Sequence, residues 1–132
     1  MAGNTERRLA AALVAALAFP AQAASVACHV TYGGETRVIS AGATSNPYTI
    51  APVPLGSYFL FSIVFRQEPT DLAGIKLTTY ADRAEGPVVI HQAAYPYPPP
   101  AASVKGFTGL NFVYEPVRDG ELQYWCELKD TP

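Results

Sequence analysis

The chain has few of the side chains on which most catalytic and metal-binding sites are built. Its 132 residues include two cysteines, two histidines and one methionine, which is Met1. A copper carrier that depends on methionine ligands is therefore excluded. No His, Cys, Asp or Glu residues have the spacing of a metal site, and no serine lies in a Gly-x-Ser-x-Gly turn. We expect no cofactor and no enzyme activity.

Concentrated positive charge and long apolar runs are also missing. Nine Lys and Arg oppose 11 Asp and Glu, for a net charge of −2, and no basic cluster is present. Nucleic acid is not an expected partner, because phosphate binding needs a concentrated positive surface. After residue 23 no apolar stretch is long enough for a bilayer span, so we expect no membrane anchor there.

Residues 1–23 have the pattern of an export signal. The Arg7-Arg8 pair precedes an apolar run, 9–19, that is too short to span a bilayer as a helix. Ala21-Gln22-Ala23 supplies a small-x-small cleavage site. We therefore expect cleavage after Ala23 and a single periplasmic or secreted domain over residues 24–132.

The same region allows two other interpretations. The Arg7-Arg8 pair hints at twin-arginine export, although Glu6 stands where Ser or Thr usually precedes the pair. Residues 25–28 have the outline of a lipobox, which would make Cys28 a lipidated N-terminus. Lipidation would leave Cys126 as an odd thiol in an oxidising compartment. We favour a Cys28–Cys126 disulfide, which would restrict the unfolded chain by about 4–5 kcal/mol.

After the signal, short β-rich runs alternate with Gly and Pro, and Asp119-Gly120 is a hairpin signal. The pattern predicts an all-β fold, either a small antiparallel β-sandwich (Ig-like or Greek key) or a small barrel of seven or eight strands. One disulfide is expected to join its first and last strands. The expected strands are 26–32, 36–40, 48–51, 57–67, 75–81, 88–94, 110–115 and 122–129.

Alternation along each strand assigns its side chains to faces, because successive residues point to opposite sides. Both cysteines fall on the apolar faces of their strands, which supports the disulfide. The expected core residues are Val26, Cys28, Val30, Tyr32, Phe59, Phe61, Ile63, Phe65, Ile75, Leu77, Leu110, Phe112, Tyr114, Leu122, Tyr124, Cys126 and Leu128.

His29 and His91 are the candidate metal ligands, with Glu127 as a possible third. A site with two histidines could hold copper or zinc. If the first and last strands are neighbours, His29 lies on the outer face close to Trp125 or Glu127, whereas His91 is expected to be partly buried. The ligand set is incomplete, so we favour two ordinary histidines and keep a metal-handling protein as an alternative.

Aromatic residues on polar faces and in loops are the best candidates for partner binding. Trp125 stands among Glu and Gln, and Tyr80 lies opposite the apolar face of its strand. Tyr95 and Tyr97 belong to the proline segment, residues 95–100, which is expected to leave the sheet as polyproline II. Exposed, rigid aromatic side chains are typical anchors of binding surfaces. The alternative is that a second layer or a loop covers them.

The segment ACHVTYGG (27–34), with Cys126 near the C-terminus, resembles small periplasmic lysozyme inhibitors of the membrane-bound and C-type class. The resemblance covers the cysteine placement and the strand spacing, and it implies a small β-barrel with a disulfide between the chain ends. The Ser/Gly-rich inhibitory loop and the Trp-x-Lys-Gly segment of that family are missing here. No functional residue is therefore carried over.

Together these observations favour an exported β-sandwich that binds another periplasmic or cell-envelope protein and catalyses nothing. Trp125 and the loop from Tyr95 to Tyr97 are the expected binding surface. The alternatives are a metal-handling protein that uses His29 and His91, a lysozyme-inhibitor-like barrel, and a small hydrolase or isomerase of unfamiliar type.

Overall fold

The computed structural model describes residues 23–100 and 103–129. The predicted export signal, residues 1–23, lies outside the described part of the chain except for its last residue, Ala23. Within the described ranges, no helix has the length and apolar character needed to cross a membrane.

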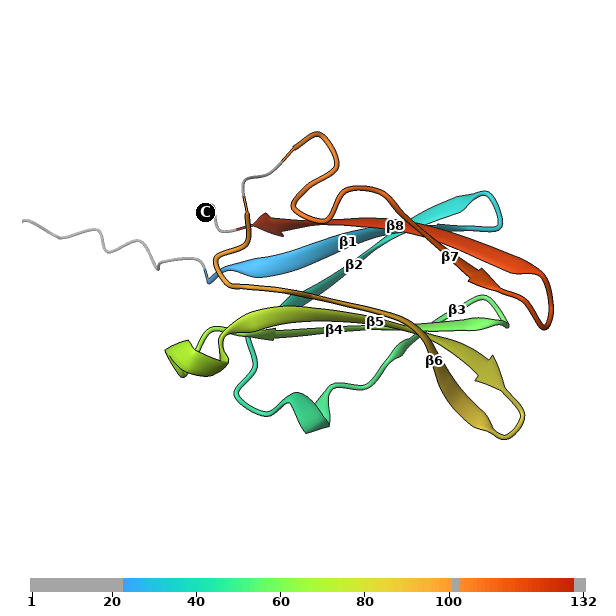
Figure 1. Ribbon diagram of the computed structural model, residues 1–132, viewed down its shortest axis with the longest axis horizontal. Coiled ribbons are helices and arrows are strands. Elements are labelled where there is room, and N and C mark those ends of the chain that lie inside the picture. Colours follow the sequence, from blue (N-terminus) through green and yellow to red (C-terminus); the bar gives the residue numbers. More distant parts are fainter. Residues whose placement is uncertain (1–22, 101–102, 130–132) are drawn as a thin grey trace, which may run out of the picture.

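Strands make up the described fold, and they form two stacked antiparallel sheets (Figure 1). We call these the β1/β8 sheet and the β4/β5 sheet after their central strands. The β1/β8 sheet has the order β2 (Glu35–Gly42), β1 (Ser25–Tyr32), β8 (Gly120–Lys129), β7 (Asn111–Glu115). The β4/β5 sheet has the order β3 (Val53–Leu55), β4 (Phe59–Arg66), β5 (Gly74–Arg83), β6 (Gly86–Tyr95).

The expected all-β class, a small antiparallel sandwich, is confirmed, and its strand order is a meander. Within each sheet, hydrogen-bonded neighbours are consecutive in the chain, except that β1 pairs with β8. The chain changes sheet between β2 and β3 and again between β6 and β7. A Greek key would place a fourth strand beside the first of three consecutive ones. The strand order is therefore not that of a Greek key, which was one of the expected arrangements. Consecutive strands are adjacent here because their connections are short.

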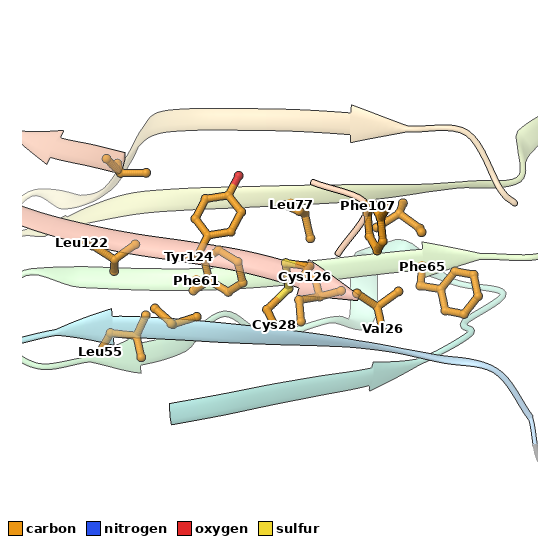
Figure 2. Packing of buried hydrophobic residues seen from close by; sticks show 14 of the residues in the cluster. Val26, Cys28, Leu55, Phe61, Phe65, Leu77, Phe107, Leu122, Tyr124 and Cys126 are labelled. Atoms are coloured by element: carbon orange, nitrogen blue, oxygen red, sulfur yellow. A yellow bond between two sulfur atoms is a disulfide. The ribbon is translucent and has the colours of Figure 1, made fainter. Parts of the chain in front are cut away.

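The core lies between the two sheets, and alternation predicts most of it correctly. Val26 and Val30 of β1 and the four expected residues of β4 are all buried. Figure 2 shows Phe61, Leu77 and Tyr124 around the disulfide, with Phe65 and Phe107 toward one end. Tyr32 and Leu128 are partly buried against this cluster. The two sheets are thus joined by one continuous apolar layer.

The disulfide joins residues that face each other directly across β1 and β8. Cys28 and Cys126 are register partners with Cα atoms 4.0 Å apart, and both are fully buried. The predicted link between the first and last strands is confirmed. With its sulfur bonded to Cys126, Cys28 has no thiol left for a lipid, so the lipobox interpretation is not supported.

Strand β7 has the opposite orientation to the expected one. Phe112 and Tyr114 are 58% and 53% exposed, and Leu110 precedes the strand and is also exposed. Val113 is the buried apolar residue of this strand, at 3% exposure, because it pairs with the inward-facing Leu122 of β8. Directly paired residues share one side of a sheet. The prediction that Leu110, Phe112 and Tyr114 belong to the core is therefore wrong.

A buried carboxylate anchors the turn between β7 and β8 to the other sheet. The Glu115 carboxylate accepts hydrogen bonds from Arg118 Nε at 2.9 Å and from the backbone N–H groups of Val117 and Arg118, while Arg118 Nη2 donates to the Tyr58 carbonyl at 3.2 Å. Burial alone would raise the pKa of Glu115, but these hydrogen bonds outweigh it and hold the pKa below its ordinary value. The turn is fixed because a buried charge is costly without such partners.

Removing the disulfide tests how strongly it supports the fold. We expect the double change Cys28→Ala/Cys126→Ala to lower the free energy of unfolding by about 2–5 kcal/mol, because the bond restricts the unfolded chain. Urea unfolding monitored by tryptophan fluorescence measures this change. Reduced wild-type protein is the matched control and should unfold at a similar urea concentration. An oxidised wild type no more stable than either would contradict the prediction.

Two truncations in β7 test which face of this strand is buried. Val113→Ala should destabilise the protein by about 1–3 kcal/mol, because it removes apolar groups from the core. The larger truncation Phe112→Ala should cost under about 1 kcal/mol, since that ring is mostly in water. Urea unfolding of both variants gives the comparison. A greater loss of stability for Phe112→Ala would show that the orientation of β7 is wrong.

Candidate functional site

The outer face of the β1/β8 sheet carries the candidate binding residues. Strand pairing places Val38 beside His29, His29 beside Trp125, and Phe112 beside Gln123. These partners point away from the core because their sequence neighbours, including both cysteines, point into it. We define the Trp125 face as the outward-facing residues Val38, His29, Trp125, Gln123, Phe112 and Tyr114.

Trp125 is held in place by His29 on the neighbouring strand. The two rings stack with centroids 4.0 Å apart and an angle of 5° between their planes. His29 Nε2 and Glu127 Oε2 are 2.6 Å apart, which fixes the orientation of the imidazole. The expectation that His29 lies close to Trp125 or Glu127 is confirmed, since it contacts both. The result is a half-buried, rigid aromatic platform.

The segment after the proline region packs over one edge of Trp125. Phe107 N–H donates to the Cys126 carbonyl at 3.0 Å, and Thr108 Oγ1 accepts from Cys126 N–H at 2.9 Å. Gly106 has a φ of +64°, and a Cβ there would lie 2.0 Å from the Cys126 carbonyl oxygen, so only glycine fits. This close approach places Lys105 Nζ 5.4 Å from the centroid of the Trp125 ring, within cation–π range.

Trp125 and the last three residues of the proline segment line one groove, without the two tyrosines that were predicted to join Trp125. Its lining includes Pro98, Pro99, Pro100, Trp125 and Leu128. The groove has a volume of about 310 Å³. Trp125 belongs both to this groove and to the Trp125 face.

Tyr95 and Tyr97 do not join this surface. The Tyr97 ring packs against Phe65 with centroids 5.0 Å apart, and its hydroxyl accepts a hydrogen bond from Gln67 Nε2 at 3.1 Å. The Tyr95 ring meets Phe107 edge-on at 5.2 Å. Both tyrosines are partly buried against the core. They act chiefly as packing residues at the end of the sandwich, as in the alternative in which such aromatics are covered.

Tyr80 lies on the opposite side of the molecule. It pairs with Leu60 of β4 and belongs to the outer face of the β4/β5 sheet, where it lines a different groove. The four predicted aromatic residues are therefore distributed over three places. Two layers separate Tyr80 from Trp125, because each faces outward from its own sheet.

His29 and His91 lie on opposite sides of the β1/β8 sheet. His91 is partly buried between the sheets, where its Nδ1 lies 3.4 Å from the hydroxyl of the inward-facing Tyr124. His29 is on the outer side of that sheet, with Trp125. One ion could not contact both imidazoles of a single molecule. Within the described ranges, no group of three or more His, Cys, Asp or Glu side chains is close enough together to hold a metal.

Burial perturbs the titration of the two groups in this interior contact. It lowers the pKa of His91 below its ordinary value of 6.5, because the imidazolium loses solvation there. It also raises the pKa of Tyr124, and the nearby Tyr95 acts in the same direction. Both groups are therefore held in their neutral forms near neutral pH.

Sequence reasoning missed Phe112 and Tyr114 as surface residues. The signal that could have found them is the parity of the hairpin loop between β7 and β8. When an even number of residues separates two paired strands, each even-numbered residue of one strand pairs with an odd-numbered residue of the other. The inward-facing residues of β8 are even-numbered, so their partners on β7 are odd-numbered, as in the pair of Leu122 with Val113. Phe112 and Tyr114 must then face outward.

Comparison with known proteins gives no match to any family model, curated protein or solved structure. The resemblance to the lysozyme inhibitors stays a prediction from the cysteine placement and the strand spacing.

The interior position of His91 predicts a pH dependence of stability. With a pKa below 6.5 in the folded protein, His91 takes up a proton at higher pH in the unfolded chain than in the folded one. Stability should therefore fall as the pH drops below about 6.5, and His91→Gln should weaken this dependence. Urea midpoints at about pH 7.5 and about pH 5 measure it in both proteins. Equal pH dependence in the variant and wild type would contradict the prediction.

Proposed function

We propose that this protein is a non-catalytic binding domain whose Trp125 face docks on a protein of the cell envelope. The observation that carries the proposal is the pair Phe112 and Tyr114, two aromatic side chains more than half exposed on one face of a sheet. Large apolar side chains placed in this way mark interaction sites when they form a patch.

The composition of the face supports a protein partner. Phe112 and Tyr114 lie on β7, Trp125 lies on the adjacent β8, and Val38, also exposed, lies across the sheet on β2. Aromatic residues are enriched at the centres of protein interfaces, whereas charged residues are depleted there. Glu121, Lys105 and Lys129 are exposed and lie on the same sheet or beside it, so they would form a polar rim.

Rigidity supports the same function. Cys28 immediately precedes His29 in β1, and Cys126 immediately follows Trp125 in β8. The disulfide therefore lies on the inner side of the sheet, beneath the stacked rings. A preformed platform loses little conformational entropy when it binds, and this favours affinity. The disulfide is also compatible with the oxidising compartment that the predicted export signal implies.

The geometry of the polar groups favours binding over catalysis. His29 Nε2 is engaged by Glu127, and the imidazole ring is stacked on Trp125. The buried Glu115 carboxylate is held by Arg118 and backbone N–H groups, which leaves it a weak acid–base candidate. Nucleophilic catalysis would need a base beside a reactive nucleophile, and both cysteine sulfurs are bonded to each other.

Site-specific photo-cross-linking tests the proposed surface. A benzoylphenylalanine placed at Phe112 in the exported protein should give a discrete adduct with one envelope protein, because its ring would be at the centre of the interface. The matched control carries the same group at Tyr48, which is 95% exposed on the other face. Adduct formation and identity are measured by gel shift and mass spectrometry.

A second change checks that the adduct reports specific docking. Tyr114→Ser should reduce the yield from position 112 by about fivefold or more, whereas Tyr48→Ser should not. Three outcomes would overturn the proposal: no adduct from position 112, the same adducts from both positions, or adducts only with a second copy of this chain.

A further inference from the structure

A second groove lies on the outer face of the β4/β5 sheet, on the side of the molecule away from Trp125. It has a volume of about 590 Å³ and lies between this face and the turn η2 (Pro47–Thr49), with Leu72 of the turn η3 (Thr70–Leu72) at one end. Figure 1 shows the η2 segment extending beyond the free side of this sheet. The proposed function does not use this groove.

A row of neutral polar side chains crosses the floor of the groove. Ser62, Thr78 and Gln92 are register partners on β4, β5 and β6. Gln92 Nε2 donates to Thr78 Oγ1 at 3.2 Å, which orients the amide and leaves its oxygen free to accept a hydrogen bond. Ser62 and Thr78 are only 6% and 5% exposed, whereas Gln92 is exposed, so Gln92 is the member of the row that can bind a ligand hydroxyl group.

Two positive charges lie beside this row without a carboxylate between them. Arg66 is the register partner of Gly74, so Lys76, two residues further along β5, is its diagonal neighbour within reach of a long side chain. No ion pair is found for either residue within the described ranges, and no carboxylate lines the groove. In the same ranges, the buried Arg66 Nε–H has no hydrogen-bond partner. Adjacent like charges and a buried unpaired donor together point to an anionic ligand.

Tyrosine rings lie on two sides of the same space. Tyr48 is 95% exposed on the η2 turn, where its N–H donates to Asn46 Oδ1 at 3.1 Å. Thr49 Oγ1 donates to the Asn46 carbonyl at 2.9 Å, so the turn is held by its own side chains. Tyr80 lines the groove from the sheet. Exposed aromatic faces beside polar groups can stack on the C–H faces of sugar rings.

We propose that this groove binds an acidic saccharide, a chain of sugar rings that carry carboxylates. The tyrosines would stack on the rings, Gln92, oriented by Thr78, would bind a neutral hydroxyl group, and Arg66 with Lys76 would bind a carboxylate. A few placed polar groups in a groove with aromatic walls are the usual composition of a small-ligand site.

The position of the groove favours a saccharide over an acidic peptide or a nucleic acid. On the face of a sheet, the backbone groups of β4 and β5 are already paired with neighbouring strands. An extended peptide gains much of its affinity from free backbone groups at a sheet edge, which this face does not offer. A nucleic acid would need many cationic side chains, and two line this groove.

Binding of defined oligomers to the oxidised protein tests the proposal. The probes are tetragalacturonate, a neutral galactose tetrasaccharide and hexaglutamate, titrated by calorimetry at low salt. We expect measurable binding of tetragalacturonate, with affinity that falls as salt rises, and binding at least about tenfold weaker for the other two. Equal binding of the neutral sugar would overturn the role of the cations, and stronger binding of hexaglutamate would indicate a peptide site.

Matched variants localise the binding. Lys76→Gln and Arg66→Gln should each weaken tetragalacturonate binding by about tenfold, and Tyr48→Ala by about fivefold. Arg37→Gln and Val117→Ala, at exposed positions outside both the groove and the Trp125 face, are the controls and should bind as the wild type does. Unchanged urea midpoints for the variants would show that folding is intact.

Two results would reject the groove as the site: no binding of tetragalacturonate, or losses as large in the control variants as in the groove variants. Because Phe112 and Tyr114 are on the other face, failure here is distinguishable from failure of the proposed protein-binding function.

Discussion

The antiparallel pairing of β1 with β8 holds the first and last strands of the sandwich together. Every other strand pair joins consecutive strands, so it closes a short connection, whereas this pair joins residues 98 positions apart at Cys28 and Cys126. It converts two separate hairpins, β1 with β2 and β7 with β8, into one sheet that covers the β4/β5 sheet. Because closing a long loop costs conformational entropy, a covalent bond between these strands stabilises the pairing of the residues that are farthest apart in the chain.

In the closed sandwich, the aromatic and titratable side chains of interest lie in three separate regions. Residues next to the cysteines face outward, which places His29 on Trp125 and leaves the aromatic side chains of β7 on the same surface. The interior takes His91 and Tyr124, two groups whose neutral forms are favoured by burial. The outer face of the β4/β5 sheet carries Arg66 and Lys76. A sandwich with two free faces can therefore present an apolar surface and a cationic groove that do not interfere with each other.

Alternation succeeded wherever a strand had one clearly apolar side. In β4 all four phenylalanine and isoleucine residues expected in the core are buried, and in β8 Leu122, Tyr124 and Cys126 are buried. It failed in β7, whose outward residues are the larger hydrophobic ones. Hydrophobicity favoured Phe112 and Tyr114 over Val113, but pairing with Leu122 decided the orientation. The same limit applies to Tyr95 and Tyr97, whose rings pack on Phe107 and Phe65, residues brought near them by folding.

The all-β class, the disulfide and the proximity of His29 to Trp125 could be predicted from the residues alone, because they follow from period-two alternation along single strands and from one covalent pairing. The meander order, the orientation of β7 and the surfaces on which the candidate residues lie could be seen only in the folded arrangement. The alternation of apolar and polar residues along a strand shows which residues share a side. The register with neighbouring strands and the packing of the second sheet then select which side is buried. Two apolar sides within one strand leave that choice to the partner strand.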